Sequence, residues 1–149
     1  MRIVVQRSLH SRVVVKEKTV GEISSGLVLL VGFTPGDTEK DIDYMVKKVL
    51  NLRIFDDEEG VMNKSILEAG GSILSISQFT LYGDAKKGNR PSYIKAMPGK
   101  EATEYYDKFN QKLKEQIEVQ TGIFGADMKV EITNDGPITI LLESGEKHD

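Results

Sequence analysis

A run of hydroxyl and amide side chains interrupts an apolar stretch near the middle of the chain, at Ser77-Gln78-Phe79-Thr80-Leu81-Tyr82-Gly83-Asp84. Ser77, Gln78 and Thr80 continue the apolar residues of a predicted strand. Because buried polar groups need hydrogen-bond partners, such a cluster either lies at the surface or lines a binding site. A half-exposed strand that ends in a Gly-Asp turn has the same pattern. The pattern alone favours this ordinary explanation.

The segment Asn134-Asp135-Gly136-Pro137 is a second candidate. Asparagine, aspartate, glycine and proline are the residues that tight turns select, each for its own conformational reason. Taken alone, the segment is best explained as a hairpin turn between two closing strands.

The residue inventory removes most familiar catalytic chemistries. The 149 residues include no cysteine and two histidines, His10 and His148. Thiolate catalysis, disulfides and cysteine-bound zinc are therefore excluded, and two histidines are too few for a zinc site built on histidine. His10 is expected at a surface strand edge, and His148 in the C-terminal tail. We expect no metal and no cofactor, so an enzyme would use hydroxyls, backbone dipoles or groups of its substrate.

The charge distribution is uneven. The formal net charge is −3, which argues against broad, nonspecific nucleic-acid binding. Residues 85–100 nevertheless carry only positive charges and no acid, at Lys86, Lys87, Arg90, Lys95 and Lys100. This basic segment is equally compatible with a solvated loop and with a contact surface for a polyanion.

The elements that position these residues can be read from apolar periodicity. Strands are predicted at residues 3–7, 12–16, 19–23, 27–33, 72–79, 128–133 and 138–142, with a short strand-like piece at 52–55. One helix follows Pro35-Gly36, with Asp37 or Thr38 as its cap and a buried face at Ile42, Met45, Val46, Val49 and Leu50. A second helix is marked by Ala102, Tyr105, Tyr106, Phe109, Leu113 and Ile117.

This element order predicts an α+β fold, a mostly antiparallel sheet or barrel with two main helices packed outside. We expect a single domain over residues 1–149, with a flexible tail from about 145. The first residues are charged too early for a signal peptide, and no apolar run approaches a membrane span. We therefore expect a cytoplasmic protein with no membrane partner.

From Met1 to about Leu142 the chain resembles the D-aminoacyl-tRNA deacylase (D-Tyr-tRNA deacylase) family. The family signatures Ser-Gln-Phe-Thr-Leu and Asn-x-Gly-Pro-[Val/Ile]-Thr are matched by residues 77–81 and 134–139. Further matches are residues 5–7, 52–55, 87–92 and 121–128. Several long matches in the same order make chance similarity an inadequate explanation.

The resemblance implies a compact, β-barrel-like homodimer with an active site at each side of the subunit interface. One subunit would supply the catalytic segment Ser77, Gln78, Phe79 and Thr80, and the other would insert Gly136-Pro137, whose peptide bond is cis in the family. The remaining expected site residues are Arg7, Phe124 and Met128 for substrate binding and chiral rejection, and Lys86, Lys87 and Arg90 for contact with tRNA.

The implied activity is hydrolysis of the ester that joins a D-amino acid to tRNA, with rejection of L-aminoacyl-tRNA and some clearance of glycyl-tRNA mischarged on tRNA(Ala). The neighbouring 2′-hydroxyl of the ribose can assist, so a missing histidine base is tolerable. Thr80 is either a nucleophile or only a backbone N–H donor. We favour the donor, because no candidate base is close to Thr80 in sequence.

Two alternatives stay open at this point. A catalytically idle tRNA-binding module would bind tRNA without cleaving the ester. A threonine-nucleophile amidohydrolase acting on small D-amino-acid derivatives would not need the basic segment. No DNA partner is expected under any of these readings.

Overall fold

The computed structural model describes residues 1–145, and its strands form three separate sheets. The five-stranded sheet has the order β10-β1-β4-β7-β8. Its strands are β1 (Arg2–Ser8), β4 (Gly26–Gly32), β7 (Ser72–Ser77), β8 (Val119–Thr121) and β10 (Asn134–Glu143). The three-stranded sheet contains β2 (Ser11–Val15), β3 (Lys18–Ile23) and β9 (Lys129–Glu131), and a small hairpin joins β5 (Phe55–Asp56) to β6 (Met62–Lys64).

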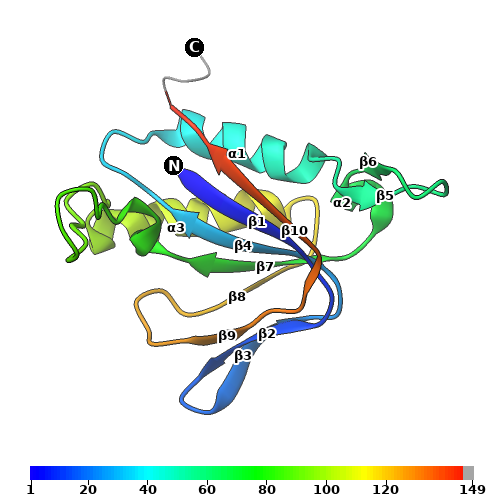
Figure 1. Ribbon diagram of the computed structural model, residues 1–149, viewed down its shortest axis with the longest axis horizontal. Coiled ribbons are helices and arrows are strands. Elements are labelled where there is room, and N and C mark those ends of the chain that lie inside the picture. Colours follow the sequence, from blue (N-terminus) through cyan, green and yellow to red (C-terminus); the bar gives the residue numbers. More distant parts are fainter. Residues whose placement is uncertain (146–149) are drawn as a thin grey trace.

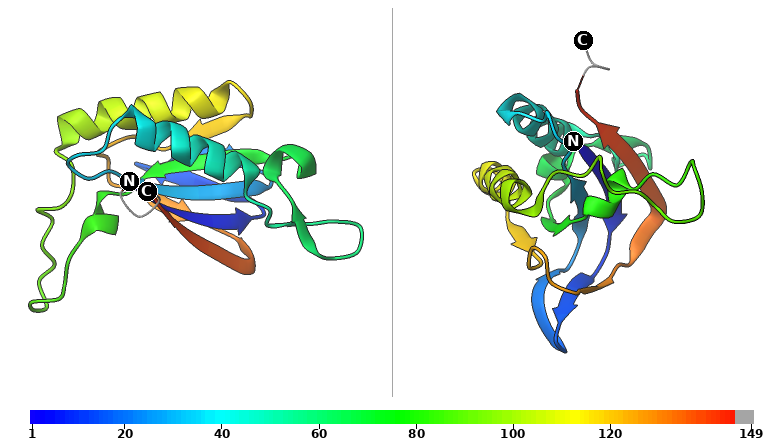
Figure 2. Two further views of the ribbon diagram at one scale, coloured as in Figure 1. Left: turned by 90° about the horizontal axis from the view of Figure 1, so that it is seen from above. Right: turned by 90° about the vertical axis from the view of Figure 1, so that its left-hand side faces the viewer.

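Two long helices, α1 (Glu39–Asn51) and α3 (Gly99–Lys114), cover one face of the five-stranded sheet (Figures 1 and 2). The predicted buried face of α1 is confirmed, and its cap is Thr38, whose side chain completes a capping box with Asp41. Asp37 has a different role, because its carboxylate accepts from the Thr34 N–H and pairs with the amino group of Met1 at 2.8 Å. A third, short helix, α2 (Ile66–Ala69), has no counterpart among the predicted elements.

The core has two parts, one on each face of the central strands. The larger part lies between the long helices and the sheet and includes Leu27, Leu29, Ile73 and Phe109. The smaller part packs β4 and β7 against the three-stranded sheet. Burial on both faces explains the unbroken apolar run of β4, in which Leu30 alone is partly exposed.

Most strand pairs are antiparallel, as expected, but two are parallel, and the expected barrel is wrong. β1 pairs antiparallel with β4 and β10, but β4–β7 and β7–β8 are parallel. The chain leaves β4 through α1 and leaves β7 through α3, and a helical crossover on one face returns each strand in the same direction. Within residues 1–145 the sheets stay open, so the chain forms no closed barrel.

Two expectations concern the end of the chain. The structure describes Gly145, but the rest of the expected flexible tail, including His148, lies outside the described residues. Among residues 1–145, no helix has the length and apolar character needed to cross a membrane.

Candidate active site

Residues 77–80 lie where β7 ends and a 3₁₀ turn, η1 (Phe79–Tyr82), begins. The Gln78 N–H donates to the Val31 carbonyl at 2.7 Å, which ties the end of β7 to β4. A Cβ at Gly32 would lie 2.9 Å from the Gln78 carbonyl oxygen, so glycine at this position permits the close approach of the two backbones. The turn is therefore held by main-chain contacts rather than by its own side chains.

Thr80 is exposed, and its hydroxyl accepts a hydrogen bond from the Gln78 amide. An amide N–H is a donor and cannot remove the hydroxyl proton. A 3₁₀ turn bonds residues three apart, so the N–H groups of Phe79 and Thr80 precede its first internal bond. No side chain caps this turn. The geometry offers two backbone donors and supplies Thr80 with no base from its neighbours.

A hollow of about 270 Å³ lies beside the end of β7. Residues 124–130 form its opposite wall, and the full lining is Ile76, Ser77, Gln78, Phe79, Phe124, Gly125, Ala126, Met128 and Val130. Met128 is placed by the close approach of Gly122, where a Cβ would meet the Met128 sulfur at 2.6 Å. The fold thus brings Ser77, Gln78 and Phe79 together with Phe124 and Met128, two segments distant in sequence.

Gly136-Pro137 lies in an outward loop of β10, and the peptide bond between the two residues is cis. While β1 advances from Gln6 to Ser8, its partner β10 runs from Thr139 back to Asn134, so the intervening residues of β10 bulge out of the ladder. The hairpin turn suggested by the local pattern is therefore wrong: β9 and β10 belong to different sheets. Gly136 has φ +120°, and a Cβ there would lie 2.8 Å from the Ile138 nitrogen.

The side chain of Asn134 closes the base of this loop. Its amide nitrogen donates to the Arg7 and Ile138 carbonyls, both at 3.0 Å, and its oxygen accepts from Gln6 and Thr139 at 3.1 Å. The carboxamide uses both of its donors and accepts twice, so it joins both ends of the loop to β1. Sequence reasoning placed Asn134 in a motif but missed this role; the signal was a carboxamide flanking Gly136-Pro137.

Arg7 lies in the gap that the bulge opens, with its side chain 12% exposed. Its guanidinium donates to the Ile54 carbonyl at 2.9 Å and lies 3.4 Å from an Asp56 oxygen. Arg7 Nε is 3.2 Å from Asp135 Oδ2, a charge contact whose angle is too poor for a hydrogen bond. Arg7 therefore reaches the Gly136-Pro137 loop through Asp135 and links the loop to β5.

The two predicted halves of the site lie at opposite ends of the central strands of one chain. Arg2 pairs with Glu143, and its guanidinium donates to the Leu81 carbonyl at 2.8 Å, so the start of β1 lies beside η1. Arg7 and the Gly136-Pro137 loop lie at the other end of β1. Arg7 follows Arg2 by five positions, which corresponds to about 17 Å at the usual rise of a strand. Within one chain, Thr80 and Gly136-Pro137 do not meet.

The basic segment forms an exposed loop next to η1. Backbone hydrogen bonds between Asp84 and Ser92, both 2.8 Å, close its base, and Lys86, Lys87 and Arg90 are exposed beyond it. The hydrogen bond from the Lys86 N–H, and to a smaller extent the Lys95 ammonium, lower the pKa of Asp84. The Asp84 carboxylate is therefore ionised, and its hydrogen bonds stabilise the loop. The exposed cations keep their charge free for a ligand.

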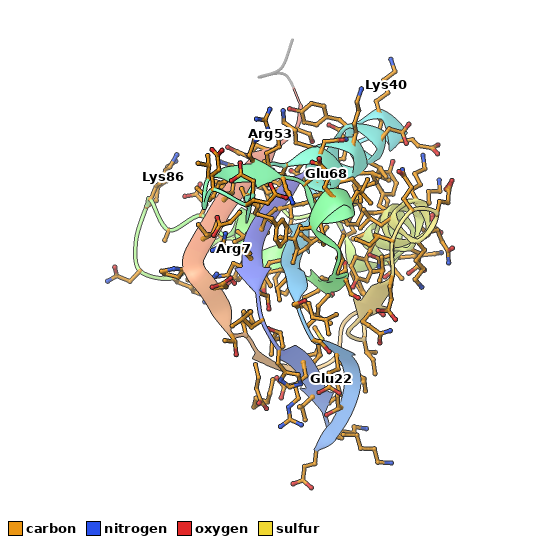
Figure 3. All side chains as sticks on the ribbon, turned by 90° about the vertical axis from the view of Figure 1, so that its right-hand side faces the viewer. Arg7, Glu22, Lys40, Arg53, Glu68 and Lys86 are labelled. Atoms are coloured by element: carbon orange, nitrogen blue, oxygen red, sulfur yellow. The ribbon has the colours of Figure 1, made fainter. Side chains whose placement is uncertain are left out.

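The expected absence of a metal centre was based on residue types, and residues 1–145 contain no group of three or more His, Asp or Glu side chains arranged to hold a metal. His10 is exposed and pairs with Glu22 on the three-stranded sheet. Figure 3 shows Glu22 at the opposite end of the molecule from Arg53. Neither His10 nor Glu22 lines the hollow beside Ser77 and Gln78.

These features define an α+β protein with an open, mainly apolar pocket at the end of β7, where Ser77 and Gln78 are the polar side chains of the lining. Residues 4–143 match the family described as D-Tyr-tRNA(Tyr) deacylase, and the chain belongs to that family. It is 55% identical over 144 residues to a D-aminoacyl-tRNA deacylase of Kosmotoga olearia, and 56% identical over 145 residues to one of Clostridium tetani. Each alignment covers 97% of this chain and 97% of the relative.

Solved structures agree with this fold. A structure described as c-Myc DNA Unwinding Element Binding Protein superposes with a TM-score of 0.93 at 41% identity, covering 98% of this chain and all 100% of the other. A structure described as a probable eukaryotic D-amino acid tRNA deacylase gives 0.81 at 18% identity, covering 95% and 97% of the two chains. The second likeness, at its low identity, concerns the fold alone.

Proposed function

We propose that this protein hydrolyses the ester bond of D-aminoacyl-tRNA, releasing the free D-amino acid and tRNA. The observation that carries the proposal is the pocket formed by Ser77, Gln78 and Phe79 with Phe124 and Met128, in a chain that matches the deacylase family over residues 4–143. Its relatives of 55% and 56% identity are named D-aminoacyl-tRNA deacylases. An aminoacyl-tRNA substrate is consistent with the expected cytoplasmic location.

The chemistry needs no histidine or metal. Water adds to the ester carbonyl, the C–O bond to the ribose breaks, and the ribose oxygen takes up a proton. The N–H groups of Phe79 and Thr80 are suited to stabilise the negative charge that develops on the carbonyl oxygen. The neighbouring ribose hydroxyl is positioned by the substrate itself to assist proton transfer. Thr80 then acts through its backbone, and its hydroxyl stays bonded to Gln78.

The complete site is a homodimer site. Ser77 to Thr80 of one subunit and Gly136-Pro137 of the other would form it, because the two segments are about 17 Å apart along β1 of one chain. The exposure of Gly136 and Pro137 on an outward loop supports insertion into a partner. A two-fold axis then makes two equivalent sites.

Chiral rejection is assigned to the same loop. An enzyme that accepts many side chains has to read the direction in which Cβ leaves Cα. Gly136 presents bare backbone, and Pro137 adds no donor, so both can approach an α-carbon closely. An L side chain would collide with this backbone, whereas a D side chain would point away. Glycine has no side chain to reject, so glycyl-tRNA(Ala) is a minor substrate of this proposal.

The basic loop supplies tRNA contacts. Lys86, Lys87 and Arg90 are exposed beside η1 and suit phosphates of the acceptor end. The absence of a DNA partner stays a prediction, and the name of the 41%-identical relative makes it worth testing.

One assay separates this proposal from its alternatives. Release of labelled amino acid is measured from D-Tyr-tRNA, L-Tyr-tRNA, Gly-tRNA(Ala) and N-acyl-D-tyrosine. The proposal expects rapid release from the first, slower release from the third and almost none from the others. Binding without release would support an idle tRNA-binding module, and cleavage of N-acyl-D-tyrosine would support an amidohydrolase.

Subunit complementation tests the shared site. Ala126→Trp fills the pocket beside Ser77, and Gly136→Ala disrupts the inserted loop. Each homodimer is inactive by this proposal, but a heterodimer keeps one intact site. When equal amounts of the two variants are unfolded together and refolded, half of the dimers should be heterodimers with one intact site of two. The mixture should therefore recover about a quarter of the wild-type activity. No recovery from well-folded mixed dimers would contradict a site shared between subunits.

A further inference from the structure

A second hollow lies at the end of α1, away from the Ser77–Gln78 pocket. It encloses about 400 Å³, and Tyr44, Lys47, Lys48, Asn51, Leu52 and Arg53 line it. We call it the α1 hollow. The lining combines an aromatic ring and a leucine with three cationic side chains and contains no acid. No step of the proposed reaction uses it.

The positive charges of the α1 hollow are available. Among residues 1–145, no carboxylate lies within ion-pair distance of Lys47, Lys48 or Arg53. Lys48 Nζ lies 5.8 Å from the centre of the Tyr44 ring, and Arg53 donates to the Asn63 carbonyl at 3.2 Å. A guanidinium has five N–H donors, so Arg53 retains donors for a ligand.

The acidic turn that follows, residues 56–59, forms no ion pair with Lys47, Lys48 or Arg53 in the described part of the chain. Asp56 lies beside Arg7, and Glu58 is paired with Lys64 at 2.8 Å. Asp57 accepts from the N–H groups of Glu59 and Val61 and holds its own turn. The stabilisation of a helix C-terminus by a cation explains Lys48. This effect does not account for the cation at Arg53, which lies beyond the helix, or for the presence of Tyr44 and Leu52 in the lining.

The location of the α1 hollow links it to the reaction. Arg53 precedes Ile54, whose carbonyl accepts from Arg7, and Arg7 contacts Asp135 beside Gly136-Pro137. Figure 3 views the molecule from this side and shows Arg7 and Arg53 on it. In Figure 1 the basic loop is at the left edge and β5–β6 is at the right edge, so one chain carries its two basic surfaces at opposite ends.

We propose that the α1 hollow binds a phosphate and an adjoining base of the tRNA substrate, in the subunit that inserts Gly136-Pro137. This inference rests on the shared site of the proposed function. In that dimer, the Lys86 loop of one subunit and the α1 hollow of its partner flank the same ester. The cations suit a phosphate, and the Tyr44 ring and Leu52 offer a surface on which a base can stack.

The first test is the binding of uncharged tRNA, which needs no catalysis. Lys48→Glu should weaken binding, and the double variant with Lys47→Glu should weaken it further and flatten the salt dependence by about two phosphate contacts. Lys108→Glu is the matched control, because Lys108 lies 5.9 Å from the Tyr105 ring on α3 and makes the same charge change outside the hollow. Equal loss in Lys48→Glu and Lys108→Glu would overturn the inference.

The second test uses a minimal ester, D-tyrosine attached to adenosine. It lacks the rest of the tRNA, so Lys48→Glu should cleave it as fast as the wild type while KM for full D-Tyr-tRNA rises about tenfold. A matched loss on both substrates would show that Lys48 acts on the ester site or on folding, and would overturn the inference. Failure of the wild type to cleave either ester would instead contradict the proposed function.

The third test asks which subunit contributes the hollow. In Ala126→Trp/Gly136→Ala heterodimers, the intact site takes its Gly136 from the Ala126→Trp chain. Lys48→Glu should raise KM when it is placed on that chain and leave KM unchanged when placed on the Gly136→Ala chain. Equal effects of the two placements, or the reverse order, would contradict the assignment of the hollow to the inserting subunit.

Discussion

Asn134 offers the sharpest test of how the Gly136-Pro137 loop is held. Asn134→Ala removes four hydrogen bonds, two to the Arg7 and Ile138 carbonyls and two from Gln6 and Thr139. At a net value of about 0.5–1.5 kcal/mol each, their loss lowers the free energy of unfolding by about 2–6 kcal/mol. For a chain of this length the melting temperature should fall by about 5–20 °C.

The variant should also lose activity under conditions where it stays folded. At a temperature where the variant is folded, the freed loop no longer holds its backbone against the substrate. A displacement of about 1 Å costs roughly 100-fold in rate, so kcat/KM for D-Tyr-tRNA should fall by about that factor. The ratio of D-Tyr-tRNA to L-Tyr-tRNA cleavage should narrow as well, because a mobile loop rejects the L side chain less well.

Urea denaturation and initial rates on both substrates measure the two effects. Asn63→Ala removes only exposed side-chain contacts, with Arg53 and Asp57, and is the stability control. Asn134→Asp keeps the acceptors, loses both donors and should resemble Asn134→Ala. A folded Asn134→Ala with unchanged kcat/KM and an unchanged D-to-L ratio would refute the view that this carboxamide positions the loop. An unchanged free energy of unfolding in Asn134→Ala would refute the claim that these hydrogen bonds stabilise the fold.

Three further predictions concern other contacts. Gly136→Ala should abolish D-Tyr-tRNA cleavage because the new Cβ would collide with Ile138. Gly70→Ala is the control, because Gly70 has φ +81° with nothing within 4 Å, and it should cost only stability. Similar losses of steady-state activity in the two variants would contradict this prediction. Thr80→Ala should keep most of kcat. Phe79→Pro deletes a backbone N–H of the turn and should lower kcat far more than Phe79→Ala does. A collapse of kcat in Thr80→Ala would point instead to a hydroxyl nucleophile. Tyr106→Phe removes the 2.7 Å bond to the Ser75 carbonyl and should cost about 1–2 kcal/mol in urea unfolding. Burial raises the pKa of Tyr106, so its contribution is complete below the ordinary tyrosine pKa of about 10 and is lost as pH rises through the folded value; the stability gap to Tyr106→Phe should shrink there.

Motif recognition and geometry contributed differently to the candidate site. The signatures named Ser77, Gln78, Gly136 and Pro137, and the structure places the first two with Met128 in one pocket. Nothing in the spacing of these residues predicts that the two signatures lie at opposite ends of β1. The separation follows from strand register, which depends on pairing between distant segments.

The bulge in β10 is a second feature that local patterns misassign. The residue types of Asn134-Asp135-Gly136-Pro137 are those of a hairpin turn. The strands before and after them pair with different partners, β9 with β2 and β10 with β1. The same four residues therefore form an outward loop inside a strand. Their conformational preferences are satisfied in both arrangements, so only the partner strands decide between them.

The sequence by itself determined the local structure and the available chemistry. Apolar periodicity located the buried faces of α1 and α3, the unbroken run of β4 marked a strand buried on both sides, and the missing cysteines removed whole classes of mechanism. These properties depend on residue type and on neighbours a few positions away. The tertiary structure alone decided the parallel pairing of β4 with β7, the clamp of Asn134 on β1 and the basic hollow at the end of α1. Each of these joins segments far apart in the chain, and their contacts form only when the whole core packs.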